Sequence, residues 1–146
     1  MNFELQIDGD AIQRAGEEMF QSLRQPMQAA MAEKFYEITR NNFGMSGEDR
    51  PTEWPPLSER YAKKVDRDYA TLFVSGDLEA SINWSAANQE YSEVWSDSPL
   101  ATVHQWGEGR CPARPFMPIL KSGELTEYAR LQVTDAALQI LNQSSR

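Results

Sequence analysis

Apolar residues near the N-terminus first alternate with polar ones and then repeat every three or four positions. The alternation in residues 3–7 predicts a half-buried strand. From Ala11 the apolar positions step by three and four, which predicts an amphipathic helix of about four turns capped by Asp10. Pro26 is expected to stop or kink this helix. A second helix follows, ends near residues 41–44 with Gly44 as its cap, and carries an apolar face of Met27, Met31, Phe35 and Ile38.

The middle of the chain predicts short elements separated by loops. Residues 45–56 form a proline-containing loop, in which Trp54 is expected to fill an edge of the core. Ser58 is the expected N-cap of a short helix that runs to about residue 65, and Ser75 of a single helical turn. The helix that begins after Ser58 has a basic face. We favour the interpretation that this face is solvated over the interpretation that it is a docking site. Alternating apolar positions in two runs, 82–86 and 91–95, predict a β-hairpin.

We expect the fold to be organised around residues 101–116, which include both the only His and the only Cys. A short helix opening at Ser98-Pro99 is predicted to end at Trp106, with Gly107 as the first residue beyond it. Residues before proline avoid the helical region, so residues 112–116 should be extended and should present Phe116 as a fixed anchor. A structural loop that crosses the edge of the core is an equally good interpretation of this stretch.

The last periodic segment, residues 126–142, predicts a helix with one apolar side, followed by a frayed tail at 143–146. The predicted fold class is α+β, with N-terminal helices and a C-terminal helix packed on a small, mainly antiparallel sheet. A length of 146 residues suits one domain, 1–146, with a core of useful size.

Charge and composition narrow the function classes. The chain has 22 acidic and 14 basic residues and a net charge of −8, which argues against a protein that binds the nucleic-acid backbone. One cysteine excludes an internal disulfide and fits a reducing cytosol. The sequence has no run of about 18 apolar residues and no basic, apolar leader, so we expect neither a membrane span nor a signal peptide.

The sequence offers little catalytic chemistry. It contains no GxSxG, GxxxxGK[ST], HExxH or GxGxxG motif, and a single His with scattered acids predicts no metal and no cofactor. His104 and Cys111 are seven residues apart and would need to meet within hydrogen-bond reach to form a catalytic pair. We therefore expect no catalytic residues and favour an interaction protein. A small Cys/His hydrolase and an acidic inhibitor of the DNA-mimic type remain as alternatives.

Several short motifs follow one another in a definite order. These are WPPLS at 54–58, LFVSGDLEASI at 72–82, ATVHQWG at 101–107 and PARPF at 112–116. In this order they resemble the tailed-phage virion morphogenesis family, the Mu-like tail-completion or neck proteins. The chain departs from the family pattern at Cys111, where an aliphatic residue is commoner, and in the short gap after Gly107.

The resemblance implies a non-enzymatic virion protein that completes the tail and helps join it to the head. It also implies a homo-oligomer, expected as a hexameric ring, that contacts other tail and head–tail connector proteins and requires no nucleic acid and no membrane. The protein would be a virion component assembled in the bacterial host cytoplasm. The residues that we expect to form assembly interfaces or to organise the loops are Trp54, Leu57, Gly76, Leu78, His104, Trp106, Gly107, Arg114, Pro115 and Phe116. For Arg114, pinning the loop to the fold and contacting another subunit are equally good interpretations.

Overall fold

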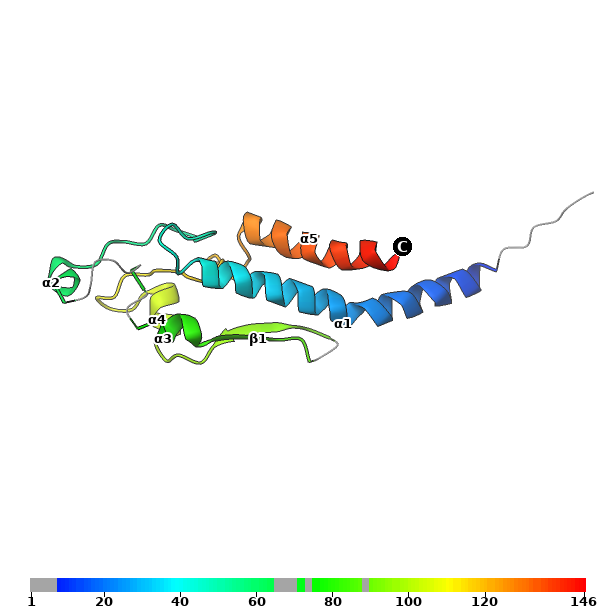
Figure 1. The fold of residues 1–146 in the computed structure, drawn as a ribbon, viewed down its shortest axis with the longest axis horizontal. Helices are drawn as coiled ribbons and strands as arrows, with labels where there is room; N and C mark the ends of the chain where they lie inside the picture. Colours follow the sequence, from blue (N-terminus) through cyan, green and yellow to red (C-terminus); the bar gives the residue numbers. More distant parts are fainter. Residues whose placement is uncertain (1–7, 65–70, 73–74, 88–89) are drawn as a thin grey trace, which may run out of the picture.

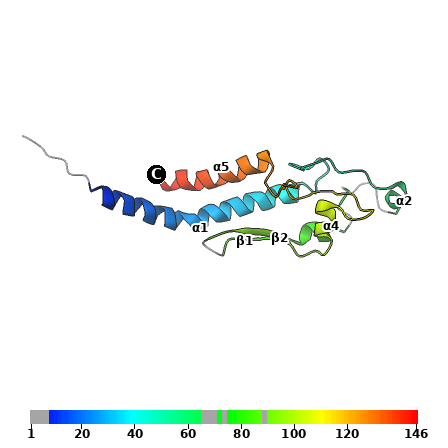
Figure 2. The same ribbon diagram turned by 180° about the vertical axis from the view of Figure 1, so that it is seen from behind.

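The computed structural model describes residues 8–64, 71–72, 75–87 and 90–146. The molecule is elongated along one long helix, α1 (Gly9–Asn41) (Figure 1). Helix α5 (Glu127–Ser144) lies along one side of α1, and a two-stranded hairpin lies along the opposite side in both views (Figure 2). The short helices and the loops gather beyond the C-terminal end of α1. No described helix combines the length and hydropathy that a membrane span needs.

Helix α1 is continuous over 33 residues and contains Pro26 near its middle. The prediction of a stop at Pro26 is wrong, whereas the kink is visible as a bend of the ribbon in both views (Figures 1 and 2). Proline removes one helical hydrogen bond and crowds the preceding turn. The packing of the later turns against α5 and the hairpin stabilises the helix across this defect, because helices in proteins depend mainly on tertiary packing.

Both ends of α1 differ from the prediction. The helix begins at Gly9 instead of Ala11, because the side chain of Asp8, not Asp10, caps it by accepting a 3.0 Å hydrogen bond from the Ala11 N–H. At the other end the cap is Asn42, with right-handed φ and ψ of −66° and −18°. The expected glycine cap is wrong, since Gly44 is not among the glycines with positive φ.

Helix α5 buries the apolar side that the sequence predicts. Ala129, Val133 and Ala137, spaced four residues apart, are buried, and α5 packs on α1. Thr126 caps the helix by accepting a hydrogen bond from the Ala129 N–H at 3.2 Å. The helix continues to Ser144, two residues past the predicted end, so residues 143 and 144 of the expected frayed tail are helical.

The hairpin consists of β1 (Ile82–Ser85) and β2 (Glu93–Ser96), which pair antiparallel with Trp84 opposite Val94. This confirms the predicted hairpin and, with the flanking helices, the α+β class. Helix α3 (Asp77–Ala80) precedes β1, but its N-cap is Gly76 at φ 84° and not Ser75. The left-handed conformation is accessible to glycine without strain, which accounts for Gly76 at this turn. The predicted strand at 3–7 lies outside the described residues.

Two further short helices flank the loops. Ser58 caps α2 (Glu59–Ala62) as predicted, but the helix ends at Ala62, three residues before the expected end, with Lys63 as its C-cap. Helix α4 (Ala101–Trp106) ends as predicted, with Gly107 at φ 79°, although it begins at Ala101 rather than at Ser98-Pro99. A Cβ on Gly107 would lie 2.9 Å from the Ala113 backbone nitrogen, so the loop after α4 needs glycine at this position.

The core below these loops is centred on Phe43, Ile82 and Phe116. Each comes from a different segment of the chain: the turn that follows α1, the start of β1 and the stretch after α4. Half-buried side chains surround this cluster, among them Trp54 and Leu78. The core therefore joins the long helix and the hairpin to the loop region, and it fixes the loops that carry the candidate site.

Candidate functional site

Helix α4 fixes the proline-containing segment 112–117 through one buried amide. The Gln105 Oε1 atom accepts hydrogen bonds from the N–H groups of Phe116 at 3.1 Å and Met117 at 3.0 Å, and its Nε2 atom donates to the Met117 carbonyl at 3.1 Å. The Arg114 N–H donates to the His104 carbonyl at 2.7 Å. Phe116 is 1% exposed, and its ring centroid lies 5.3 Å from that of Phe43. The segment is therefore held both by hydrogen bonds and by an aromatic anchor.

The WPPLS segment lies across the PARPF segment. The Trp54 indole N–H donates to the Pro115 carbonyl at 2.8 Å, and the Trp54 ring meets Phe43 edge to face at 6.2 Å. The Arg50 guanidinium lies over the Trp54 ring, 3.7 Å from its centre. Burial lowers the pKa of Arg50 from its ordinary value. We call the cross-bonded segments 54–58 and 112–117 the loop frame.

Arg114 completes the loop frame with its charged side chain. Its Nε atom donates to the Pro55 carbonyl and its Nη2 atom to the Pro56 carbonyl, both at 2.9 Å. The residue is 6% exposed, and no carboxylate in the described ranges lies within ion-pair distance of it. The guanidinium thus pins one proline segment to the other through neutral acceptors and is a buried charge without a counter-ion in that part of the chain.

Asn42 is a central residue that sequence reasoning missed. It is fully buried, and its Nδ2 atom donates to the carbonyls of Asp49 and Phe116, both at 2.9 Å. Its Oδ1 atom accepts from the N–H groups of Glu48 at 2.9 Å and Asp49 at 2.7 Å. One amide therefore satisfies four backbone groups and ties the end of α1 to the loop frame. The only sequence signal was an Asn pair at a predicted helix end, which is also typical of an ordinary cap.

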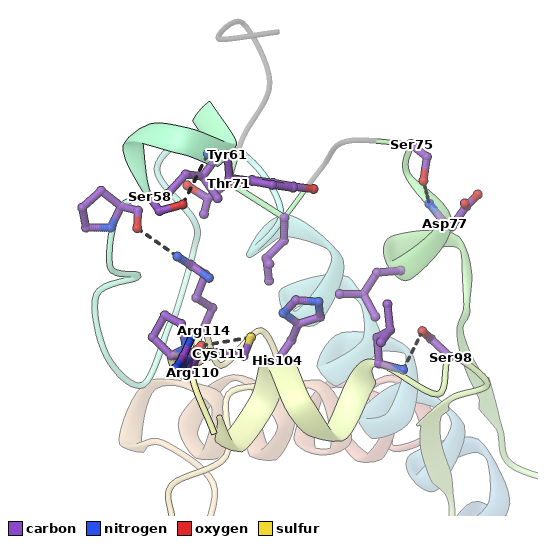
Figure 3. Close-up of a pocket in the computed structure, with 16 residues that line it drawn as sticks. Ser58, Tyr61, Thr71, Ser75, Asp77, Ser98, His104, Arg110, Cys111 and Arg114 are labelled. Carbon is purple, nitrogen blue, oxygen red and sulfur yellow. Dashed lines mark hydrogen bonds between the residues drawn. The ribbon is translucent and has the colours of Figure 1, made fainter. Parts of the chain in front are cut away.

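A pocket of about 710 Å³ opens beside the loop frame, between α2, α3 and α4 (Figure 3). Apolar lining comes from Leu57 and Leu78, and polar lining from His104, Arg110, Cys111 and Arg114. Figure 3 shows His104 rising from α4 into the middle of the pocket, with Arg114 and Cys111 to one side of it. The pocket is assembled from segments that are far apart in the sequence.

The residues predicted to act in assembly or loop organisation fall into distinct places. Four of them line the pocket: Leu57, Leu78, His104 and Arg114. Trp54, Pro115 and Phe116 belong to the loop frame and the core. Gly76 and Gly107 make turns with positive φ, and Trp106 is 40% exposed outside the pocket. The structure therefore brings most of these residues together but separates Trp106 from the pocket.

His104 and Cys111 share the pocket without bonding to each other. The Cys111 thiol donates to the Pro112 carbonyl at 3.9 Å, and the His104 Nδ1 atom is buried with no hydrogen-bond partner in the described part of the chain. Burial lowers the pKa of His104 below its ordinary value of 6.5, and the positive charge of Arg114 lowers it further. A nucleophilic pair needs a thiol–imidazole hydrogen bond and a third orienting group. The described geometry supplies neither.

The lowered pKa of His104 predicts how stability depends on pH. The unfolded chain binds a proton at this residue near pH 6.5, whereas the folded chain binds it only at lower pH. The stability that the neutral His104 side chain contributes to the fold is therefore fully present above about pH 6.5. It is lost as the pH falls below that value. We expect the melting temperature of His104→Gln to fall less than that of the parent between about pH 7 and about pH 5. Fluorimetric melts across this range test it, and equal falls would contradict it.

The fold and the loop frame define a small α+β protein built on one long helix, with a rigid region of loops at one end. The sequence pattern that defines the phage virion morphogenesis family matches residues 6–142, and the chain belongs to this family. No curated protein and no solved structure matches the chain. The family match confirms the resemblance that the ordered motifs indicate, and it assigns the chain a role in phage virion morphogenesis.

Proposed function

We propose that this chain is a non-enzymatic structural protein that completes the phage tail and helps join it to the head, as a homo-oligomeric ring. Membership of the virion morphogenesis family over residues 6–142 supports the general role. The observation that carries the finer role is a set of large apolar side chains exposed on α1 and α5. They are Ile12, Met19, Phe20, Leu131 and Leu138. Side chains of this kind on two separate helices favour contacts with other protein surfaces.

The loop frame supports a role in docking. Its proline segments are held by Gln105, Trp54 and Arg114, so their shape is fixed before any partner arrives. A preorganised surface loses little conformational entropy on binding, which favours stable assembly. The partners that we propose are other tail and head–tail connector proteins, met in the bacterial host cytoplasm.

Net charge sets the conditions for assembly. At −8, identical copies repel one another until basic surfaces of a partner compensate. We therefore expect weak self-association of the isolated protein and ring formation at high concentration or on a tail tube. Light scattering over a concentration series, with and without purified tail tubes, measures this. A species that stays monomeric in all of these conditions would count against the ring.

A phage that lacks this gene tests the role in the virion. Electron microscopy of infected-cell lysates is expected to show filled heads and separate tails, and a plasmid copy of the parent gene should restore joined particles. An epitope-tagged copy should label the head-proximal end of the tail. Joined, infectious particles without the gene, or label confined to the distal tip, would refute the proposed function.

A further inference from the structure

The N-terminal part of α1 stands apart from the rest of the molecule. Every residue from Asp8 to Ser22 is exposed, including Ile12 at 63% and Phe20 at 55%. The N-terminal end of α1 projects past the end of α5 and past the hairpin in both views (Figures 1 and 2). A helical segment of this length without tertiary packing is marginal in water, so a surface that covers its apolar side would stabilise it. We call residues 8–22 the helix arm.

The tip of the helix arm is acidic. Residues 8–13 include Asp8 and Asp10 but no Lys or Arg, and the first basic residue is Arg14. The Asp8 side chain caps the helix. It also forms an exposed ion pair with Arg14 at 4.0 Å, which contributes little to the stability of the helix. Asp10 has no ion pair in the described part of the chain. The tip therefore offers an available carboxylate two residues before the apolar side chain of Ile12.

The pocket at the opposite end of the molecule has the complementary chemistry. Arg114 is buried there with neutral acceptors alone, and Arg110 on the same rim is exposed. A buried guanidinium that lacks an anion is electrostatically unfavourable, so an incoming carboxylate would be stabilised. Leu57 and Leu78 supply an apolar wall. The described lining also contains a carboxylate, Asp77, which lies on the α3 side of the pocket away from Arg110 and Arg114 (Figure 3). A short acidic and apolar segment therefore matches the side of the pocket that the two arginines form.

We propose that the pocket binds the tip of the helix arm of a second copy of this chain. Asp10 on one side of the arm would face Arg110 and Arg114, and Ile12, on the opposite side of the same helix, would lie against the apolar wall. The arm tip lies at one end of α1, and the helices that line the pocket, α2, α3 and α4, lie beyond the other end (Figure 1). Each copy would therefore use one end to bind and the other to be bound. Such a heterologous contact generates a ring when the rotation between copies closes. The inference rests on the proposed ring and specifies the contact between its neighbours.

Cys111 provides the test, because it is the only cysteine and it lines the pocket. In the full chain, Ala11→Cys places a second thiol at the exposed tip of the arm and keeps Asp10 and Ile12. Oxidation with diamide under assembly conditions is expected to link the introduced thiol of one copy to Cys111 of the next, which gives a ladder of dimers, trimers and larger species on non-reducing gels. The matched control is Gln21→Cys on the same exposed arm, about 15 Å further along the helix. It should give no ladder.

A second variant that also carries Cys111→Ser distinguishes a crosslink between arm and pocket from a crosslink between two arms. Ala11→Cys in that background is expected to give no crosslinks, whereas dimers that persist there would show that arm tips meet each other and would overturn the proposal. Absence of a ladder from Ala11→Cys while the parent forms oligomers would also overturn it and would leave the ring intact. A parent that stays monomeric by light scattering, with and without tail tubes, would overturn both.

A charge exchange tests the same contact without a covalent bond. Arg110→Asp is at an exposed loop position and should leave the melting temperature unchanged. Asp10→Lys puts a positive charge in the first turn of α1, so its helix content is checked against the parent by circular dichroism before association is compared. Each alone is expected to raise the concentration for half-association by about tenfold or more, as a close interfacial charge pair predicts. The double variant should recover most of this loss. Single variants that associate like the parent would overturn the proposal.

Discussion

Replacing Phe116 by alanine is expected to lower the free energy of unfolding by about 3–5 kcal/mol. The ring is 1% exposed and packs against Phe43, so its removal leaves a cavity at the meeting point of α1, β1 and the loop frame. The hydrogen bonds of Gln105 to the backbone of residues 116 and 117 hold that backbone in place, which limits collapse into the cavity. Urea unfolding monitored by circular dichroism measures the change.

The matched control is Trp106→Ala in the same stretch of sequence. Trp106 is a larger aromatic but is 40% exposed, so its removal leaves an opening to solvent and not an enclosed cavity. We expect a loss of about 1–2 kcal/mol, smaller than that of Phe116→Ala. If both variants lose the same free energy, the destabilisation comes from any change in this stretch rather than from burial. If Phe116→Ala unfolds at the parent's urea concentration, Phe116 is not the anchor of the core.

The elements that sequence predicted correctly are those specified by local patterns. Helix α5 follows from apolar residues four positions apart, and the N-cap of α2 follows from Ser58 alone. The continuity of α1 through Pro26 could not be predicted, because a proline breaks or bends a helix according to what packs around it. Local propensity sets the cost of the proline, but contacts with α5 and the hairpin decide the outcome.

The candidate site was predictable in part. The ordered motifs identified the segments that form the loop frame, and the density of Pro and Gly in residues 101–116 indicated a fixed backbone path. For Arg114 the hydrogen bonds to Pro55 and Pro56 favour the structural interpretation that sequence had left open. Asn42 and Gln105 were missed because a buried amide that bonds to backbone groups can have any residue types as partners. Such bonds therefore produce no recognisable pattern in the sequence. The Phe116 carbonyl lies 74 residues from Asn42.

Substituting Asn42 by aspartate is expected to destabilise the fold strongly at neutral pH. The amide Nδ2 now donates to two carbonyls, and in the variant a carboxylate oxygen would face the same carbonyls from a fully buried position. Unpaired buried carbonyls cost about 1–3 kcal/mol each, and burial of the charge adds to this. We therefore expect a loss of at least about 3 kcal/mol at pH 7, measured by urea unfolding.

The pH dependence of Asn42→Asp distinguishes a buried charge from simple misfit. Burial among carbonyl oxygens should raise the pKa of the new carboxyl group in the folded state above its unfolded value of about 3.9. The Arg50 guanidinium, which donates to the backbone carbonyl of residue 42 at 2.9 and 2.7 Å, opposes this rise and limits its size. A carboxyl group with a raised pKa destabilises the fold at neutral pH, and the loss shrinks as the pH falls through the raised pKa, because the neutral acid can donate one hydrogen bond. The stability difference from the parent should therefore narrow between about pH 7 and about pH 4.5. Asn42→Ala is the control, because it removes the same hydrogen bonds without adding a titratable group. Its difference from the parent should stay constant over this range, and parallel curves for both variants would show that the introduced carboxyl group is not held as a buried charge.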